Sequence, residues 1–387
     1  MAEPACIYFD NNATTHMDSV VAECMHSLNL EGTANPASQH RQGRRALHLI
    51  EAAKTDILKA VDAPWAGMDS AQVILTSGGT EANNLAVFGM LKMRPGIAIV
   101  GSTDHPSILE AAKHDRDPSE FRVLSVDQRG QFNKEQLAHW LETETVSFVS
   151  LMLGNNETGI IQDLKTICEM CRPYGVPVHS DIVQAIGKIP VSFRELGLSA
   201  ATLTGHKIHG PVGVGALIVD SELKLEPVMI GGGQQLGLRA GTEPVVPAVG
   251  LACSLREIIG ALEAGEFEKV LKLRDEFEQL ALGLENVQVV GADAPRLPHT
   301  SNLSFIGADR QALHMALDLA GLACSTGSAC SSGSSRPSGS LVAMQLPDDV
   351  VRGSLRFSLS RFSTHKEVNQ AFCILSEALN RCVSTTN

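Results

Sequence analysis

Lys207 is the residue with the clearest potential for chemistry in this sequence. It lies in the turn TGHKIHGP at residues 204–211, after the apolar stretch 200–203 and before the glycine-led stretch 213–219. A lysine on a turn between two buried strands is poorly solvated, and desolvation lowers the pKa of its amine and frees it as a nucleophile. A Schiff-base lysine needs this property. Taken alone, the pattern is more often that of a lysine in an ordinary turn.

A glycine turn, TSGGTE at residues 76–81, follows a predicted strand and opens a predicted helix. The free backbone N–H groups and the positive dipole end of such a helix favour a phosphate, and Gly79 lets the backbone approach it closely. The turn is neither a P-loop, because no Gly-Lys-Ser/Thr follows, nor a G-x-G-x-x-G motif. A tight turn without a ligand is the plainer interpretation.

Three more polar side chains come directly after predicted strands: His105 in DHPS, Asn156 in NNETG and Asp181 in HSDIVQ. Ligands of α/β sheets bind at the carboxyl ends of the strands. A histidine there can stack on a planar ring, and a buried aspartate can keep a pyridine nitrogen protonated, which makes the ring an electron sink. Singly, Asp181 could equally cap a helix, and His105 could be a core or capping residue.

Together these side chains form the set that pyridoxal phosphate requires. The cofactor needs a phosphate cradle, a stacking ring, an acid for the pyridine nitrogen and a lysine for the aldehyde. Their shared placement after successive strands is hard to explain by folding needs alone. The sequence therefore predicts a pyridoxal-phosphate site at one edge of a sheet, and a cofactor of this kind acts on amino acids.

Two features lie outside that set. Cys330 stands in GSACSSG, within a Ser- and Gly-rich segment at residues 325–340 that could also be a flexible linker. A buried structural cysteine seldom has only small neighbours, so we predict a reactive nucleophile on a loop. Arg356, in the alternating stretch SLRFS, resembles an edge-strand residue whose guanidinium fork matches a substrate carboxylate; a surface ion pair is the alternative.

Alternating strands and helices must position these residues. Between residues 72 and 219, short apolar runs alternate with helix-like segments, which predicts a largely parallel sheet covered on both faces. A helical region precedes this sheet at residues 38–61, and a long helical passage follows it at 244–284. We predict an α/β fold with a large domain at residues 16–259 and a smaller α/β domain formed by residues 1–15 and 260–387. Within the smaller domain we expect strands at 287–290, 301–306 and 354–359, and helices at 310–319 and 366–382.

The bulk composition excludes several classes of protein. The chain has 387 residues, a net charge of −12 and no run of five basic residues, which argues against a nucleic-acid surface. No apolar run approaches the roughly 20 residues of a membrane span, and no export or organelle signal is evident, so we expect a cytoplasmic protein. The nine cysteines are odd in number and irregularly spaced, which favours reduced thiols. Cys168 and Cys171 form a C-x-x-C pair without a second pair at zinc-finger spacing, so we expect packed helix cysteines and no metal.

These motifs resemble the pyridoxal-phosphate-dependent cysteine desulfurases of the class V aminotransferase superfamily. The resemblance is closest to the NifS/IscS group, with selenocysteine lyases as relatives, and extends nearly from end to end. The matching motifs, in the family's order, are YFDNNATT at 8–15, NPAS at 35–38, GGTE at 78–81, HPS at 105–107, NNETG at 155–159, HSD at 179–181, GHK at 205–207, RAGT at 239–242 and SAC at 328–330.

The resemblance implies a fold-type-I architecture with a mainly parallel seven-stranded sheet, a homodimer, and roles for individual residues. Lys207 would form the Schiff base, Asp181 would pair with the pyridine nitrogen, and His105 would stack on the ring. Gln184 would bond the phenolic oxygen, and Cys330 would attack the substrate sulfur. The residues implied for the phosphate are Gly79, Thr80, Thr204 and His206, with Thr242 of the other subunit. Those implied for the substrate are Asn12, Asn156 and Arg356.

The implied reaction takes sulfur from L-cysteine, leaves L-alanine, and holds the sulfur as a persulfide on Cys330. An acceptor protein, such as an iron–sulfur scaffold or a sulfur carrier, would then receive it. A selenocysteine lyase, another reaction of the superfamily such as transamination, and a catalytically silent platform remain alternatives. The sequence departs from the family at Val212, often a basic residue, and at residues 334–337, SSRP, where an acidic residue usually precedes the proline. Cys324 could compete as the nucleophile, although the GSAC context favours Cys330.

Overall fold

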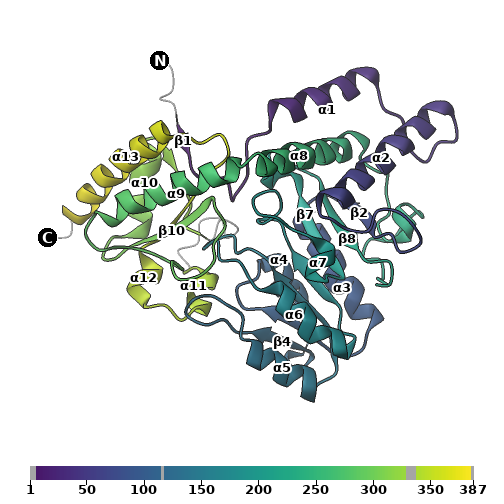
Figure 1. Ribbon diagram of the computed structural model, residues 1–387, viewed down its shortest axis with the longest axis horizontal. Coiled ribbons are helices and arrows are strands. Elements are labelled where there is room, and N and C mark those ends of the chain that lie inside the picture. The colour runs from purple at the N-terminus through teal and green to yellow at the C-terminus, as the bar shows by residue number, and fades with distance from the viewer. Residues whose placement is uncertain (1–5, 115–116, 328–336, 385–387) are drawn as a thin grey trace.

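A computed structural model describes residues 6–114, 117–327 and 337–384, and its main feature is a seven-stranded sheet (Figure 1). The strands lie in the order β2-β8-β7-β6-β5-β3-β4, and every neighbouring pair is parallel except the two that involve β8. The predicted α/β fold with a mainly parallel seven-stranded sheet is therefore confirmed. The strand bounds are β2 Gln72–Thr76, β3 Ile97–Gly101, β4 Phe121–Leu124, β5 Val146–Met152, β6 Val178–Asp181, β7 Ala200–Thr204 and β8 Gly215–Val219.

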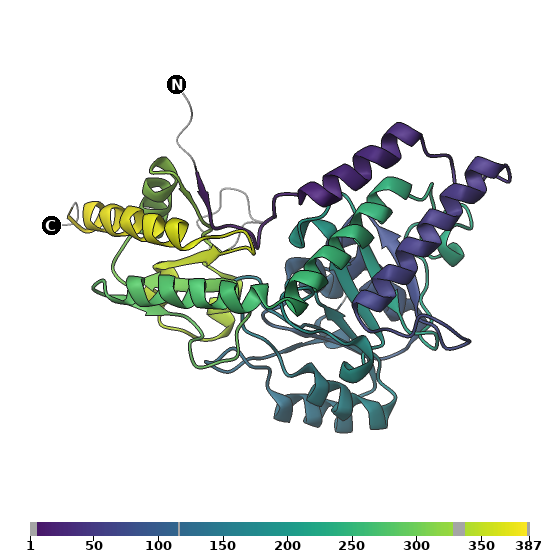
Figure 2. The same ribbon diagram turned by 45° about the horizontal axis from the view of Figure 1, so that its top comes forward.

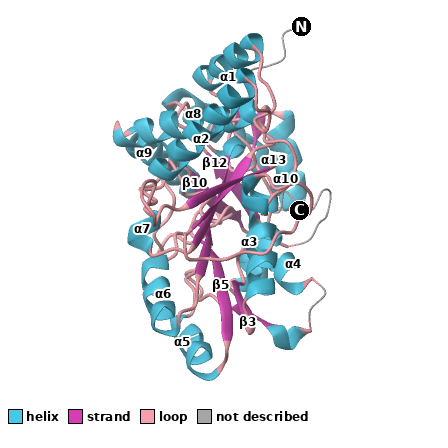
Figure 3. Cartoon of the chain, turned by 90° about the vertical axis from the view of Figure 1, so that its right-hand side faces the viewer, coloured by secondary structure: helices cyan, strands magenta, loops and turns pink. Residues whose placement is uncertain are grey.

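The two faces of this sheet bury alternate side chains against different helices. Ile74 packs in the cluster under α3 (Gly79–Met93) and α4 (Pro106–Lys113), whereas its neighbours Val73 and Leu75 belong to the larger cluster on the opposite face. Side chains of a strand alternate between faces, so a strand covered on both faces is apolar throughout. The opposite face is covered by α2 Arg41–Ala60, α5 Lys134–Thr143, α6 Leu164–Cys171 and α8 Val245–Glu263. Figure 3 shows the strands enclosed between helices.

Helix α8 is long and apolar enough to cross a membrane by its length and composition. It packs instead against α2 and α1 (Ser19–Glu31), and 61% of its most apolar window is buried. This is the environment of a core helix. Helix α1 was not predicted from the sequence. Val21 is its one buried residue, so its sequence shows hardly any apolar stripe.

A second, smaller sheet lies beside the first. Strands β12 (Ser354–Ser358), β10 (Thr300–Phe305) and β9 (Val287–Val289) form an antiparallel sheet, and β1 (Ile7–Tyr8) pairs in parallel with β11 (Leu322–Ala323). The accompanying helices are α9 Glu266–Leu282, α10 Arg310–Leu319, α11 Gly339–Ala343, α12 Asp348–Arg352 and α13 His365–Ser384, with α7 Phe193–Leu196 in the large part.

Helix α9 packs on α13, β9 and β10 of the smaller part, whereas the preceding α8 packs on α1 and α2 beside the large sheet (Figure 2). The domain boundary at residue 260 stays a prediction.

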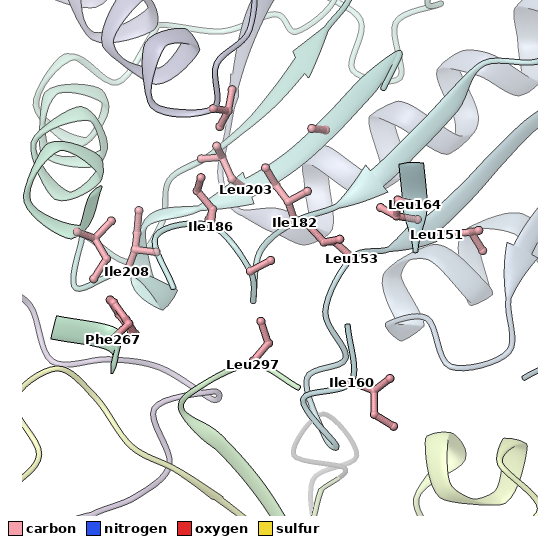
Figure 4. Packing of buried hydrophobic residues seen from close by; sticks show 14 of the residues in the cluster. Leu151, Leu153, Ile160, Leu164, Ile182, Ile186, Leu203, Ile208, Phe267 and Leu297 are labelled. Carbon is pink, nitrogen blue, oxygen red and sulfur yellow. The ribbon is translucent and has the colours of Figure 1, made fainter. Parts of the chain in front are cut away.

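The two parts share one hydrophobic core. Leu203 and Ile182, at the ends of the large sheet, belong to the same cluster as Phe267 of α9 and Leu297, which precedes β10 (Figure 4). All four are at most 5% exposed. Close packing of this kind resists small displacements. Polar groups from the two parts are therefore held in fixed relative positions where the parts meet.

Candidate active site

Lys207 ends the short 3₁₀ helix Gly205–Lys207 that follows β7. The turn is compact at its start: a Cβ on Gly205 would lie 2.7 Å from the carbonyl oxygen of Pro211. Lys207 Nζ donates to the backbone carbonyls of Asn12 and Ala13, at 2.5 and 2.6 Å. The lysine thus stands at the edge of the sheet, as expected, and the N-terminal segment of the chain lies against its amine.

A second lysine, Lys188, bonds the backbone of Lys207. Lys188 is 6% exposed, and its Nζ donates to the backbone carbonyl of Lys207 at 3.0 Å. Burial, and secondarily the charge of Lys207, lower the pKa of Lys188 to about 7. Burial and the same two lysines lower the pKa of His206 to about 4. This concentration of basic groups favours an anionic ligand such as a phosphate. Lys188 follows Gln184 by four residues on a tight turn, and its role was not predicted from the sequence.

Asp181 ends β6 and heads a chain of hydrogen bonds to His105. Its Oδ1 accepts from the backbone N–H of Val183 at 3.0 Å, and its Oδ2 accepts from Asn83 Nδ2 at 2.8 Å. Asn83 Nδ2 also donates to Ser107 Oγ, which lies 2.8 Å from His105 Nδ1. His105 itself caps α4, so the capping interpretation and the expected role at the site are compatible. Asn83 was missed in the sequence, although it follows Gly79 by four residues and so shares its face of α3.

Three buried side-chain atoms near Lys207 have no hydrogen-bond partner among the described residues. These atoms are Gln184 Oε1, Asn12 Oδ1 and Arg356 Nε. Buried polar atoms are normally paired, so such atoms together at one edge indicate a site built for a polar ligand. Pyridoxal phosphate fits this donor set: a carboxylate for its ring nitrogen, an amide for its phenolic oxygen and a lysine for its aldehyde.

The phosphate end of the site is the start of α3. Gly78 caps this helix without a side-chain hydrogen bond, so its first backbone N–H groups remain available to an anion. Thr80 is exposed beside it, and a Cβ on Gly79 would lie 3.9 Å from Cβ of Thr204. The Thr204 hydroxyl donates to the Val214 carbonyl at 3.0 Å. A cradle at Gly79, Thr80 and Thr204 remains a prediction supported by this proximity.

Arg356, on β12 of the smaller sheet, lies beside Asn12 and Asn156. It is 2% exposed, its Nη1 donates to the Asn156 carbonyl at 2.9 Å, and its Nη2 pairs with Asp10 Oδ1 at 2.5 Å. Asn12 Nδ2 also donates to the Asn156 carbonyl, at 3.1 Å. Asn156, Asn12 and Arg356 are therefore together. The arginine is in a buried ion pair, not the surface pair that was the alternative, and a substrate carboxylate would share its guanidinium with Asp10.

One predicted residue is not brought to this group. Thr242 is exposed in the segment before α8, and the hydrogen bonds of the described residues do not connect it to Lys207. Cys330 lies outside the described residues. Cys324 is buried, and burial raises the pKa of its thiol well above the ordinary range.

Cys168 and Cys171 are buried on α6 in the main core, and burial raises the pKa of each to about 12. Among the residues with described positions, groups of His, Cys, Asp and Glu suited to holding a metal ion are absent. The pair thus packs as core thiols.

The burial of His179 on β6 predicts how the free energy of unfolding depends on pH. It is fully buried between Ser150 Oγ at 2.8 Å and Thr202 Oγ1 at 3.0 Å, and burial lowers its pKa to about 3. Because the folded pKa lies below the unfolded value of about 6.5, its contribution to stability is present above pH 6.5 and is lost as the pH falls toward 3. We expect the unfolding free energy, measured by denaturant titration, to decline more steeply below pH 6.5 in the wild type than in His179→Gln. Parallel pH profiles would contradict this.

The mainly parallel sheet with a lysine after β7, an aspartate at the end of β6 and a glycine turn after β2 defines the class of pyridoxal-phosphate-dependent fold-type-I enzymes. Residues 7–371 match the model of the family described as Aminotransferase class-V. The chain belongs to this family and, within it, to the cysteine desulfurases.

Individual relatives place it there. It is 34% identical to "Cysteine desulfurase IscS" of Dictyoglomus turgidum, with 97% of this chain and 95% of the relative covered. It is 36% identical to the protein of the same name from Pectobacterium carotovorum subsp. carotovorum, with 97% and 93% covered. Among solved structures, a NifS-like protein from Rickettsia africae is similar with a TM-score of 0.89, 31% identity and coverage of 97% and 99%. A structure described as "SspA in complex with cysteine" is similar with a TM-score of 0.77, 26% identity and coverage of 92% and 99%.

Proposed function

We propose that this protein takes sulfur from L-cysteine, releases L-alanine and carries the sulfur as a persulfide on Cys330. The observation that carries the proposal is the meeting of Lys207, Asp181, Gln184 and Arg356 at one sheet edge, where several buried polar atoms have no hydrogen-bond partner among the described residues. Its substrate is supported by the cysteine desulfurase relatives and by the neighbour solved with cysteine.

Each of these residues has a defined task. Bound pyridoxal phosphate would supply an electron sink for negative charge at the substrate Cα. Asp181, oriented by Asn83 and the Val183 N–H, would hold the proton of the ring nitrogen. Lys207 Nζ would hold the cofactor through its aldehyde, and as a free amine it would move the proton of the substrate Cα. His105 would stack on the ring.

The substrate carboxylate would lie at Arg356 and Asn156, near Asn12. Arg356 is fixed by Asp10 and by the Asn156 carbonyl, so its guanidinium needs little reorganisation when a carboxylate arrives. The Cys330 thiolate would attack the substrate sulfur, whose bond to Cβ breaks as the S–S bond forms. The electron pair of the C–S bond would leave with the three-carbon product, which becomes alanine on protonation.

We further propose a homodimer, a cytoplasmic location and a sulfur acceptor protein. A dimer is supported by strongly exposed apolar side chains such as Val212, Ile230 and Leu236, and it would bring Thr242 to the partner's phosphate. All eight cysteines in the described part of the chain are free, as a reducing compartment keeps them. The acceptor would be an iron–sulfur scaffold or a carrier protein.

The test is the release of sulfide and alanine from L-cysteine by the purified yellow protein, with L-selenocysteine assayed in parallel. We expect equal amounts of both products from cysteine. Turnover of selenocysteine alone would make the protein a selenocysteine lyase, the second candidate. Inactivity toward both substrates would contradict the proposal and indicate another reaction of the family.

A further inference from the structure

Glu157 is a buried carboxylate that the proposed reaction does not use. It follows Asn156 directly and is 8% exposed. Its Oε1 accepts a hydrogen bond from Ser340 Oγ at 3.0 Å, whereas its Oε2 is buried without a hydrogen-bond partner among the described residues. Burying a carboxylate with one oxygen unpaired is costly. Such a group at an active-site edge is therefore a candidate for a functional role.

The Glu157 carboxylate lies against both flanks of the segment 328–336, which contains Cys330. Before the segment, a Cβ on Gly327 would lie 2.7 Å from Glu157 Oε2, so the carboxylate contacts the backbone of this glycine. The φ angle of Gly327 is +93°, which favours glycine. After the segment, Ser340 stands in the first turn of α11. One side chain thus lies beside both points where the segment leaves the described fold.

The same two flanks are bonded to the proposed substrate site. Asn155 Nδ2 also donates to Ser340 Oγ, at 3.2 Å, so residues on either side of Asn156 hold this serine. On the other flank, Ser325 and Arg356 exchange backbone hydrogen bonds of 2.7 and 3.0 Å. Arg356 is therefore bonded directly to one flank, and Asn156 lies between the two residues that bond the other.

We propose that Glu157 is a positioning residue for sulfur transfer. Its hydrogen bond with Ser340 fixes the C-terminal flank of the Cys330 segment relative to Asn156, and thereby sets the approach of the thiol to the substrate sulfur. This inference rests on the proposed function. Glu157 acts through Ser340 and need not touch the substrate.

The test compares holoenzyme variants in a single turnover with L-cysteine, in which persulfide on Cys330 is quantified by alkylation and mass spectrometry. We expect Ser340→Ala and Glu157→Ala each to slow persulfide formation by about fivefold or more, because Glu157→Ala removes one hydrogen bond of Ser340 and Ser340→Ala removes that bond and the one from Asn155. The double variant should be no slower than the slower single variant, because both remove the same interaction. Glu157→Gln keeps an acceptor oxygen for Ser340 and should retain the rate within about twofold.

Two further readouts separate positioning from general damage. The change in cofactor absorption on binding cysteine should keep its concentration dependence in all these variants, because binding does not need the thiol. Ser304→Ala is the matched control. Ser304 is a buried serine of β10, and its hydroxyl donates to the carbonyl of Val350 in α12 at 2.8 Å. It should keep the wild-type rate of persulfide formation.

Hydrogen exchange of the amides at 325–327 and 338–343 tests the contact independently of activity. Faster exchange in Ser340→Ala and Glu157→Ala, but not in Ser304→Ala, is expected. Wild-type persulfide rates in both alanine variants, equal slowing in Ser304→Ala, or unchanged exchange at both flanks would overturn the inference. An absence of persulfide in the wild type would instead contradict the proposed function, and the exchange result would still decide whether Glu157 holds the flanks.

Discussion

We expect Lys207→Ala to remove the visible absorption of lysine-bound cofactor and to lower turnover of L-cysteine by at least about a thousandfold, since in the proposed reaction Lys207 is both the covalent attachment and the base. The two carbonyls that Lys207 Nζ contacts, those of Asn12 and Ala13, are backbone groups and cannot replace it. Absorption spectroscopy and alanine release measure the two effects.

The matched control is Lys113→Ala, at an exposed lysine of α4 that pairs with Glu110. It should keep both the colour and the rate. Alanine release by Lys207→Ala at a rate near that of the wild type would show that another amine acts, and Lys188 would be the first residue to examine.

Cys330→Ala keeps the yellow colour and loses sulfide release. In the proposed reaction the thiol only receives sulfur, so absorption and its change on adding L-cysteine should persist, while the sulfur would have no acceptor. We expect sulfide formation to fall by at least about a hundredfold, measured together with alanine.

Cys324→Ala is the control for this assignment. The Cys324 thiol is buried and its pKa is raised, which makes a thiolate scarce, so this variant should still release sulfide. Wild-type sulfide release by Cys330→Ala, with loss in Cys324→Ala, would reverse the assignment.

The strongly apolar segments of the fold were predictable from the sequence. The expected helix at 310–319 agrees with α10 residue for residue, and the expected strand at 301–306 differs from β10 by one residue at each end. Strand β4 and helix α5 were missed, because β4 lies at the sheet edge with three half-buried residues and α5 has two buried residues. Periodicity detects burial, and these elements bury little.

For the site, the residues that follow strands were predictable because parallel strands end at one edge. Lys207, Asp181 and Asn156 are at that edge. Asp10 and Lys188 were not predicted, because their roles depend on contacts that local sequence does not encode. Asp10 pairs with Arg356, 346 residues away, and Lys188 bonds the Lys207 carbonyl.

The contacts of the N-terminal segment have a consequence for synthesis on the ribosome. Asn11 donates to the carbonyl of Ser358, 347 residues later, and Ile7 pairs with Leu322 of β11. The segment that contacts the lysine amine therefore has to wait for β11 and β12 to emerge before it can be placed. Contacts of such long range are formed late in folding. A nascent chain that lacks β12 can form the large sheet but has no Ser358 carbonyl to hold the N-terminal segment, so we expect the contacts of the Lys207 amine to be completed only after β12 has been synthesised.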